Sequence, residues 1–234
     1  MSNQEQWDDE YKNPRFISLS HKPQKDFFRF VKWLKKNKNI DFTQKLSVLD
    51  LGAGVGRNSF YMADNYDAKV YAYDFSEEAL EQARMIHAHP QISFVLHNIA
   101  EPYDLPDNSV DIILDVTSSN ALNEKERTVY LAECQRVLKK DGYLYVRTLA
   151  KEGDVNAQKM IQEFPGGEKD TYIHPVRKIR ERVFSGPDFK KLYGNYFKVI
   201  RMERKTGYQR WGKQNYKRNY WNVYLKSNKG EEVI

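Results

Sequence analysis

Short apolar runs alternate with helix-like segments through residues 45–149, and this alternation narrows the possible folds more than any other feature of the chain. The runs have the length and the Val, Ile, Leu and Tyr content of strands, and they read KLSVLDLG, KVYAYDFS, ISFVLHN, SVDIILDVT and YLYVRTL. Longer segments with apolar residues at helical spacing, such as NEKERTVYLAECQRVLKK, separate several of them. Strands alternating with helices imply parallel strands joined by crossover helices. We therefore expect an α/β fold with a doubly wound, mostly parallel sheet and helices on both faces.

The segment before this region is expected to be helical. Large apolar residues recur there at helical spacing with lysines between them, and they are Phe27, Phe28, Phe30, Val31 and Leu34. We expect residues 1–43 to form an N-terminal helical lid. The main domain is then expected to span residues 44–226, with a short tail at 227–234.

The alternation stops after residue 149. Residues 150–185 contain Pro165-Gly166-Gly167 and are expected to form an insertion before a helix, GPDFKKLYGNYF. Two strand-like runs follow, FKVIRME and NYWNVYLKS. The segment between them, RKTGYQRWGKQNYKR, predicts a long loop within residues 203–218, across which the two runs pair antiparallel.

Length and composition restrict the class of protein. At 234 residues the chain is long enough for one domain with a substantial core. There is no run of 18 apolar residues, and the polar start MSNQEQWDDEYKNP lacks the apolar segment of a secretory signal. Cys134 is the only cysteine, which excludes an internal disulfide and argues against a zinc site. We expect a cytoplasmic protein with no membrane partner and no metal.

Charge is spread unevenly along the chain. Residues 1–150 carry 19 Lys and Arg against 22 Asp and Glu, a net charge of −3, whereas residues 151–226 carry 18 against 8, a net charge of +10. This asymmetry favours an anionic partner for the C-terminal third. A solvated basic surface is the alternative.

The stretch VLDLGAGVGR, residues 48–57, joins the first predicted strand to a helix through three glycines. Such a turn directs backbone N–H groups and a helix N-terminus toward a ligand. A dinucleotide fingerprint would need a glycine where this chain has Arg57. Asp50, just before the loop, would repel a pyrophosphate but suits an ammonium group. Asp74 ends the second predicted strand, at the spacing expected for a carboxylate that binds ribose hydroxyls.

At this point the chain resembles the class I S-adenosylmethionine-dependent methyltransferases. VLDLGAGVGR resembles the first motif of that family, and YAYDFS, HNIAEPYDLPDNSVDIILD and LKKDGYLYVRTL resemble the later ones in order. The run GAGVGRNSFYMA looks most like the tellurite-resistance and thiopurine-type small-molecule branch. The resemblance covers roughly residues 45–150. It implies a Rossmann-like, seven-stranded sheet whose last two strands are antiparallel, and S-adenosyl-L-methionine as the cofactor.

The resemblance also implies roles for individual residues. The glycine loop should wrap the methionine moiety, with Asp50 near its ammonium, Asp74 on the ribose and Phe75 against the adenine. Asn98 and Ile99 stand where the family has an acidic and a small apolar residue near adenine. Tyr11 matches a lid tyrosine, although a surface aromatic packing on the sheet is equally compatible. The cofactor-binding residues implied in this way are Tyr11, Asp50, Gly52, Ala53, Gly54, Gly56, Arg57, Asp74, Phe75, Asn98, Ile99 and Asp115.

Catalytic residues are harder to predict, because methyl transfer from a sulfonium needs no protonation of the leaving group. A general base is required only when the acceptor arrives protonated. Asp115 follows the fourth predicted strand, where cofactor and substrate should meet, although it could equally cap the strand end. Tyr172 and His174 in TYIHP, expected on a polar loop, are the other candidates for a base or a substrate contact. A structural or solvated histidine is the alternative.

Several acceptor classes lack their motifs. The chain lacks the Asn- or Asp-Pro-Pro-aromatic motif of amino-methylating DNA enzymes and the paired glutamates of protein arginine enzymes. Cytosine C5 enzymes need a nucleophilic cysteine in the active-site cleft, whereas Cys134 lies on a predicted helix. A small-molecule acceptor, methylated at oxygen, nitrogen or a chalcogen, is the favoured prediction, and an anionic one would match the basic C-terminal third. The alternatives are an RNA methyltransferase using the basic loop with Tyr208, Trp211 and Tyr216, and a non-catalytic regulator or partner subunit. The protein is expected to be a monomer or a homodimer.

Overall fold

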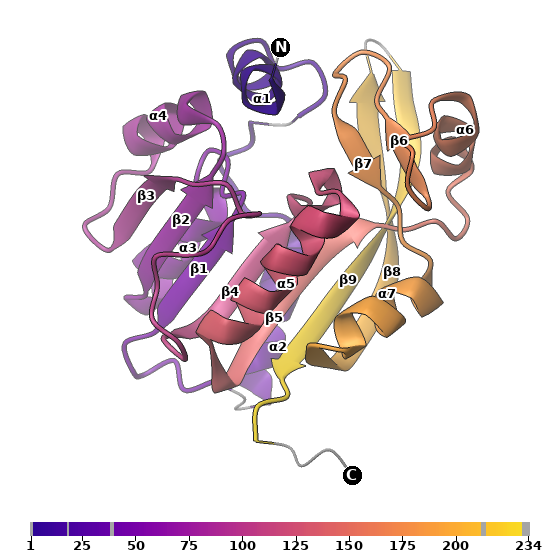
Figure 1. Cartoon of the computed structure of the whole chain (residues 1–234). Helices are drawn as coiled ribbons and strands as arrows, with labels where there is room; N and C mark the ends of the chain where they lie inside the picture. The colour runs from indigo at the N-terminus through magenta and orange to yellow at the C-terminus, as the bar shows by residue number, and fades with distance from the viewer. Residues whose placement is uncertain (1, 18, 38–39, 212–213, 231–234) are drawn as a thin grey trace.

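A twisted sheet with helices on both faces forms the body of the protein (Figure 1). The computed structural model describes residues 2–17, 19–37, 40–211 and 214–230. Within them, a seven-stranded sheet has the order β3-β2-β1-β4-β5-β9-β8. Its parallel strands are β1 (Ser47–Leu51), β2 (Lys69–Asp74), β3 (Ile92–Leu96), β4 (Val110–Val116) and β5 (Leu138–Leu149). β9 (Gln214–Ser227) and β8 (Phe197–Trp211) complete it antiparallel, which confirms the predicted fold class.

Helices cover both faces because the central strands are apolar on both sides. On one face, α2 (Lys25–Lys36) and α3 (Arg57–Tyr66) pack on a cluster that includes Val48, Ile112 and Tyr145. On the other, α5 (Glu124–Val137) and α7 (Gly186–Gly194) pack on a cluster that includes Leu49 and Ile113. Side chains of neighbouring positions in β1 and β4 thus enter opposite cores, as strands of a doubly covered sheet require.

The remaining elements lie around the carboxyl ends of the parallel strands. α4 (Glu77–Ile86) follows β2, and the 3₁₀ turn η1 (Ser119–Ala121) follows β4. The 150–185 segment forms α6 (Val155–Glu163) and a small sheet of β6 (Thr171–Ile173) and β7 (Arg180–Arg182). None of the helices described in the structure is long and apolar enough to cross a membrane.

The N-terminal segment divides into two helices with different surroundings. α1 (Asn3–Lys12) lies above the carboxyl ends of the strands, between α4 and the β6–β7 sheet (Figure 1). α2 instead belongs to the core, where Phe30 stacks on Tyr145 with ring centroids 4.9 Å apart. Of the predicted lid, only α1 and the chain that follows it therefore lie over the strand ends, and lid behaviour stays a prediction.

The prediction of a long loop within residues 203–218 is wrong. β8 and β9 pair from Phe197↔Ser227 to Trp211↔Gln214 with one register shift between Val199 and Arg201, and the pairing is unbroken from Arg201↔Tyr224 onward, so the segment is a long two-stranded ribbon. Gly207, within the segment predicted as a loop, lies in β8 beside the ring of Tyr220, where an added Cβ would come within 3.1 Å of Cε2. The glycine therefore admits a cross-strand aromatic instead of breaking the strand. Gly212 and Lys213 lie outside the described residues.

Candidate functional site

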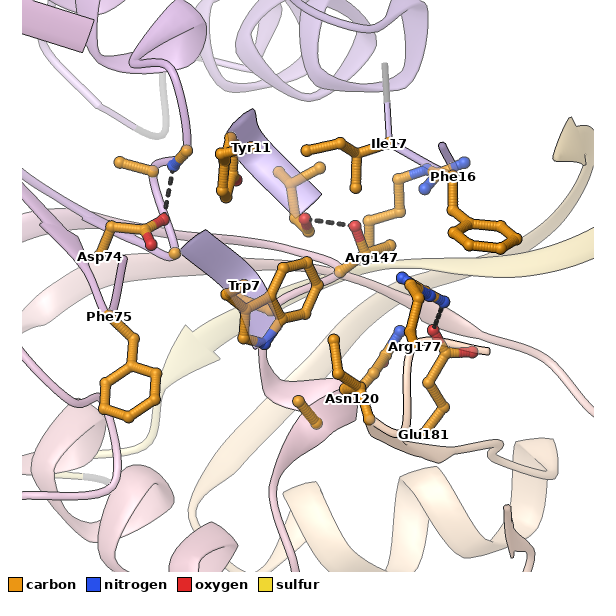
Figure 2. A pocket seen from close by; sticks show the side chains of 18 of the residues that line it. Trp7, Tyr11, Phe16, Ile17, Asp74, Phe75, Asn120, Arg147, Arg177 and Glu181 are labelled. Carbon is orange, nitrogen blue, oxygen red and sulfur yellow. Dashed lines mark hydrogen bonds and ion pairs between the residues drawn. The ribbon is translucent and has the colours of Figure 1, made fainter. Parts of the chain in front are cut away.

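A cavity of about 1090 Å³ opens at the carboxyl ends of β1, β2, β4 and β5. This is the edge at which open parallel sheets bind ligands. The glycine loop between β1 and α3 and the ends of the strands form its floor, and α1 with residues 14–17 and Leu19 covers it. In Figure 2, Asp74 and Phe75 lie at one side of the cavity and Arg177 and Glu181 at the other, with Trp7 of α1 between them.

The glycine loop needs its first two glycines for backbone conformation and close packing. Gly52 and Gly54 have φ of +67° and +57°, values that favour glycine. A Cβ on Gly52 would lie 2.3 Å from Cβ of Ser118, and one on Gly54 would lie 2.7 Å from the hydroxyl of Tyr11. Both residues line the cavity together with Ala53. The loop therefore offers backbone to the cavity where side chains would fill it.

Gly56 has a different role from the one implied for it. It is the N-cap of α3, with φ of +78°, and it does not line the cavity. An added Cβ would lie 2.9 Å from the ring of Phe94. Gly56 is thus required for the packing of α3 against β3, not for contact with a ligand.

Asp74 presents a carboxylate to the cavity. Its Oδ2 accepts from the backbone N of Gly54 at 2.7 Å, and its Oδ1 accepts from the N of Ser76 at 2.9 Å. Each carboxylate oxygen retains capacity for a further donor. Burial raises the pKa of Asp74 to about 6. The side chain is fixed from behind by the loop and by the start of α4, and its remaining lone pairs are free for a ligand diol.

Asp50 lies beneath the loop rather than on the cavity surface. It is almost fully buried, accepts from Oγ of Ser59 at 2.6 Å, and has a pKa raised to about 6 by burial. Its neighbours Arg57 and Asn58 do line the cavity. Oδ1 of Asn58 is buried without a hydrogen-bond partner among the described residues. An unpaired buried acceptor in a cavity wall indicates a place for a ligand donor.

The floor of the cavity also carries the residues implied for adenine. Phe75, Asn98 and Ile99 all line the cavity, as expected. Oδ1 of Asn98 accepts from the backbone N of Ala100 at 3.0 Å, so the residue also shapes its own turn. The slot is apolar on the sides of Phe75 and Ile99 and polar at Asn98.

The cover is held in place by two carboxylates of α1. Glu10 of α1 is fully buried, and its Oε1 accepts from the backbone N–H groups of Arg15, Phe16 and Ile17 at 2.9, 2.6 and 3.1 Å. Asp8 accepts from Oγ of Ser76 at the start of α4. Tyr11 is brought over the glycine loop by this arrangement, which agrees with the position implied for it.

Asp115 is a strand-end cap in this structure. It is fully buried and does not line the cavity. Its Oδ1 accepts from the N and Oγ of Ser118 and from the N of Ser119, and its Oδ2 accepts from the hydroxyl of Tyr130 at 2.8 Å. These four bonds hold the turn after β4 that approaches Gly52. The structure thus gives Asp115 the strand-end role that was the alternative, and its catalytic and cofactor-contacting roles stay predictions.

The polar loop expected for Tyr172 and His174 is wrong for Tyr172, which is in β6, whereas His174 lies in the turn between β6 and β7. Both side chains are buried, and neither lines the cavity. The hydroxyl of Tyr172 donates to Glu181 and accepts from Arg218, while Nδ1 of His174 accepts from the backbone N of Arg177 at 3.2 Å. Burial and the charge of Arg177 lower the pKa of His174 to about 4. Both residues support the β6–β7 wall from behind.

Other cavity residues were not singled out from the sequence. They come from α1, η1, β5, β7 and β9, and among them are Trp7, Asn120, Arg147, Glu181 and Tyr220. Arg147 had one signal, since it is the only charged residue in the predicted strand YLYVRTL. The others lie in segments whose path over the strand ends depends on tertiary packing.

Comparison with known proteins identifies the domain. Residues 48–142 match the family model described as a methyltransferase domain. The chain is 30% identical over 125 residues to the cyclopropane-fatty-acyl-phospholipid synthase of Escherichia coli K12, covering 52% of this chain and 32% of that protein. It therefore spans about a third of the length of this curated relative.

Solved structures share the fold. A SAM-dependent methyltransferase from Methanosarcina mazei superposes with a TM-score of 0.69 at 18% identity, over 82% of this chain and 96% of that one. The 1,6-didemethyltoxoflavin-N1-methyltransferase of Burkholderia thailandensis, solved with its substrate and S-adenosylhomocysteine, superposes with a TM-score of 0.58 at 16% identity, over 87% of this chain and 78% of that one.

The cavity fits S-adenosylmethionine by its donors and acceptors. Asp74 is an acceptor for a ribose diol, Phe75 and Ile99 form an apolar slot for a purine, and the loop at Gly52 leaves room for a methionine chain. The matched residues 48–142 carry this loop, Asp74 and the adenine slot. Residues 48–142 accordingly form a domain of the class I S-adenosylmethionine-dependent methyltransferase type.

Proposed function

We propose that the protein transfers a methyl group from S-adenosylmethionine to a small-molecule acceptor, at an oxygen, nitrogen or chalcogen atom. The observation that carries this proposal is the covered cavity. α1 and residues 14–17 lie across its top, and Trp7, Phe16 and Ile17 line it from above. Such a cover leaves room for a small acceptor and restricts access by a folded macromolecule.

The size of the cavity supports the same proposal. Its volume of about 1090 Å³ lies just above the range of roughly 300–1,000 Å³ typical of sites for one small ligand. A cofactor and a small acceptor together would occupy a site of this size. The Burkholderia relative binds a compound of that class, which is consistent with the proposal.

The chemistry required of the protein is mainly positioning. When bound, the cofactor would supply an electrophilic methyl group on a sulfonium sulfur, and that sulfur would leave as a neutral thioether once the acceptor atom takes the methyl group. The chain must hold the acceptor in line and exclude water, and the cover formed by Trp7 and residues 14–17 serves the second need. Because Asp115, Tyr172 and His174 do not line the cavity, we propose that the acceptor brings its nucleophile already deprotonated or that a solvent molecule takes the proton.

The RNA alternative is less well supported. At least six of the 18 basic residues at 151–226 are held in ion pairs and are therefore less available to phosphates; the pairs include Arg177–Glu181, Arg180–Glu168, Arg182–Glu124, Arg218–Asp154, Lys151–Asp170 and Lys169–Asp188. Tyr208 is 72% exposed but lines the cavity mouth, and the side chain of Trp211 lies outside the described residues.

Methyl transfer with labelled S-adenosylmethionine tests the proposal against fractionated metabolites, RNA and protein. We expect label in the metabolite fraction and none in RNA. Label confined to RNA, together with RNA binding at low salt, would replace the small-molecule proposal. Calorimetry with S-adenosylhomocysteine is the parallel measurement, because absence of binding would leave only the non-catalytic alternative.

A further inference from the structure

The charged residues that line the cavity are not balanced. Five arginines and three carboxylates line it: Arg15, Arg57, Arg147, Arg177, Arg180, Asp74, Glu126 and Glu181. Three of the arginines have carboxylate partners close by, since Arg15 pairs with Asp9, Arg177 with Glu181, and Arg180 with Glu168. Arg57 and Arg147 remain, which leaves an excess of positive charge on the cavity wall.

Arg147 is the more informative of the two, because it is nearly buried and weakly paired. Its side chain is 11% exposed, and its Nε has no hydrogen-bond partner among the described residues. The nearest carboxylate, Oδ2 of Asp26, is 4.0 Å away, and the other oxygen of Asp26 already binds Arg29 at 2.7 Å. A guanidinium removed from water without a matching carboxylate is unfavourable unless a ligand supplies the anion.

The guanidinium of Arg147 is held in one orientation by the β8–β9 ribbon. It lies over the ring of Tyr220 of β9 at 3.5 Å from the centroid. Gly207 of β8, the strand next to β9, leaves open the space beside Nη2 of Arg147. Stacking on an aromatic face leaves the edge of a guanidinium available for paired hydrogen bonds. Carboxylate and phosphate are the groups whose geometry matches that edge.

The position of Arg147 in the sheet separates it from the cofactor end of the cavity. The glycine loop follows β1 and Asp74 ends β2, whereas Arg147 is in β5, beyond β4 in the strand order. Two strand spacings correspond to about 10 Å. Arg57, in contrast, directly follows the glycine loop and is suited to the methionine carboxylate. Burial lowers the pKa of Arg57, and the charge of Arg147 lowers it further, so two cations face one cavity.

We propose that Arg147 determines acceptor specificity by binding a carboxylate or phosphate group of the methyl acceptor. This inference rests on the proposed function and narrows it to anionic acceptors. The alternative source of the same anion is the carboxylate of the cofactor itself, and the experiment must separate the two.

The test compares Arg147→Gln and Arg147→Lys with Arg201→Gln, a matched control in which an arginine of β8 outside the cavity, paired with Glu203, is replaced. Benzoate and phenyl phosphate, with benzamide and phenol as neutral counterparts, are titrated into protein saturated with S-adenosylhomocysteine. We expect the wild type to bind the anions at least about tenfold more tightly than the neutral compounds. Arg147→Gln should abolish this preference, Arg147→Lys should retain part of it, and Arg201→Gln should leave it unchanged.

Three results would overturn the proposal. The first is a wild type without preference for the anions, and the second is an equal loss in Arg147→Gln and Arg201→Gln. The third is a tenfold weaker affinity of Arg147→Gln for S-adenosylhomocysteine with unchanged probe binding, which would assign the anion to the cofactor. Failure of the wild type to bind S-adenosylhomocysteine at all would instead count against the proposed function, and circular dichroism of each variant checks that it is folded.

Discussion

At the scale of single residues, the site depends on carboxylates that are buried and therefore unfavourable in the ligand-free protein. Asp50 and Asp74 both have pKa values raised to about 6 by burial. Each is held by neighbouring donors, Ser59 for Asp50 and the backbone of Gly54 and Ser76 for Asp74. Charge kept away from water at a binding site is a common reason why such sites reduce stability.

Replacement of Asp74 tests the ribose position. We expect Asp74→Ala to weaken binding of S-adenosylhomocysteine by roughly 1–3 kcal/mol, because charge-assisted hydrogen bonds to the diol are lost. Isothermal titration measures the effect, and Asp64→Ala, on the exposed side of α3, is the matched control. Unchanged affinity in a folded Asp74→Ala protein would remove the ribose assignment.

Replacement of Asp50 tests the energetic effect of burial, with a defined pH dependence. Since the folded-state pKa is raised to about 6 from 3.8, this group favours folding below pH 4 and loses that contribution as the pH rises through 6. Asp50→Asn should therefore raise the free energy of unfolding of the ligand-free protein at pH 7.5, by about 1–3 kcal/mol. Urea unfolding should show this gain vanishing near pH 4, and a variant less stable than the wild type at pH 7.5 would contradict the argument.

At the scale of elements, the cover over the cavity is a helix and a loop joined by one side chain. Glu10 accepts three backbone N–H groups from residues 15–17, so a single carboxylate fixes the loop that carries Phe16 and Ile17. The β8–β9 ribbon has a comparable role on the other side, since Tyr220 supports Arg147. Neither arrangement is visible as a helical or strand period in the sequence.

Replacement of Glu10 tests the cover. Glu10→Ala should remove the acceptor of three partly buried backbone donors and lower the free energy of unfolding by about 1–3 kcal/mol. Hydrogen exchange should accelerate in peptides covering residues 13–19 while the strands stay protected. Glu81→Ala, at an exposed position of α4, is the control, and equal protection of residues 13–19 in both variants would show that Glu10 does not hold the loop.

At the scale of the whole molecule, the two N-terminal helices differ in what they stabilise. α1 contacts α4 and covers the cavity, whereas α2 contributes four buried side chains to the core: Phe27, Phe30, Val31 and Leu34. Burial of four such side chains is worth roughly 6–12 kcal/mol, which is comparable to the entire stability of an ordinary domain.

Truncation separates these contributions. Removal of residues 1–20 should leave a cooperatively folding protein with weakened binding of S-adenosylhomocysteine. Removal of residues 1–37 should abolish cooperative unfolding, because the face of the sheet at Val48 and Tyr145 is then exposed. Thermal unfolding followed by circular dichroism distinguishes the two, and a cooperative transition in the shorter protein would place α2 outside the essential core.

The sequence by itself determined the sheet, its mostly parallel order and the cofactor end of the cavity. Strand and helix periods are local, and the glycine loop and Asp74 lie on consecutive elements whose geometry follows from the crossover rule. Individual roles within the motifs were less predictable. Gly56 lies against Phe94 and Asp115 accepts from Tyr130, and both contacts depend on tertiary structure.

The acceptor side was decided by tertiary structure. Arg147, Trp7 and Tyr220 come from β5, α1 and β9, and no local pattern connects elements so far apart in the chain. The ribbon was missed for the same reason, since a polar two-stranded segment is stabilised by cross-strand pairs rather than by a buried face. Local periodicity thus specifies which elements form, whereas the chemistry at their ends depends on which of them packing brings together.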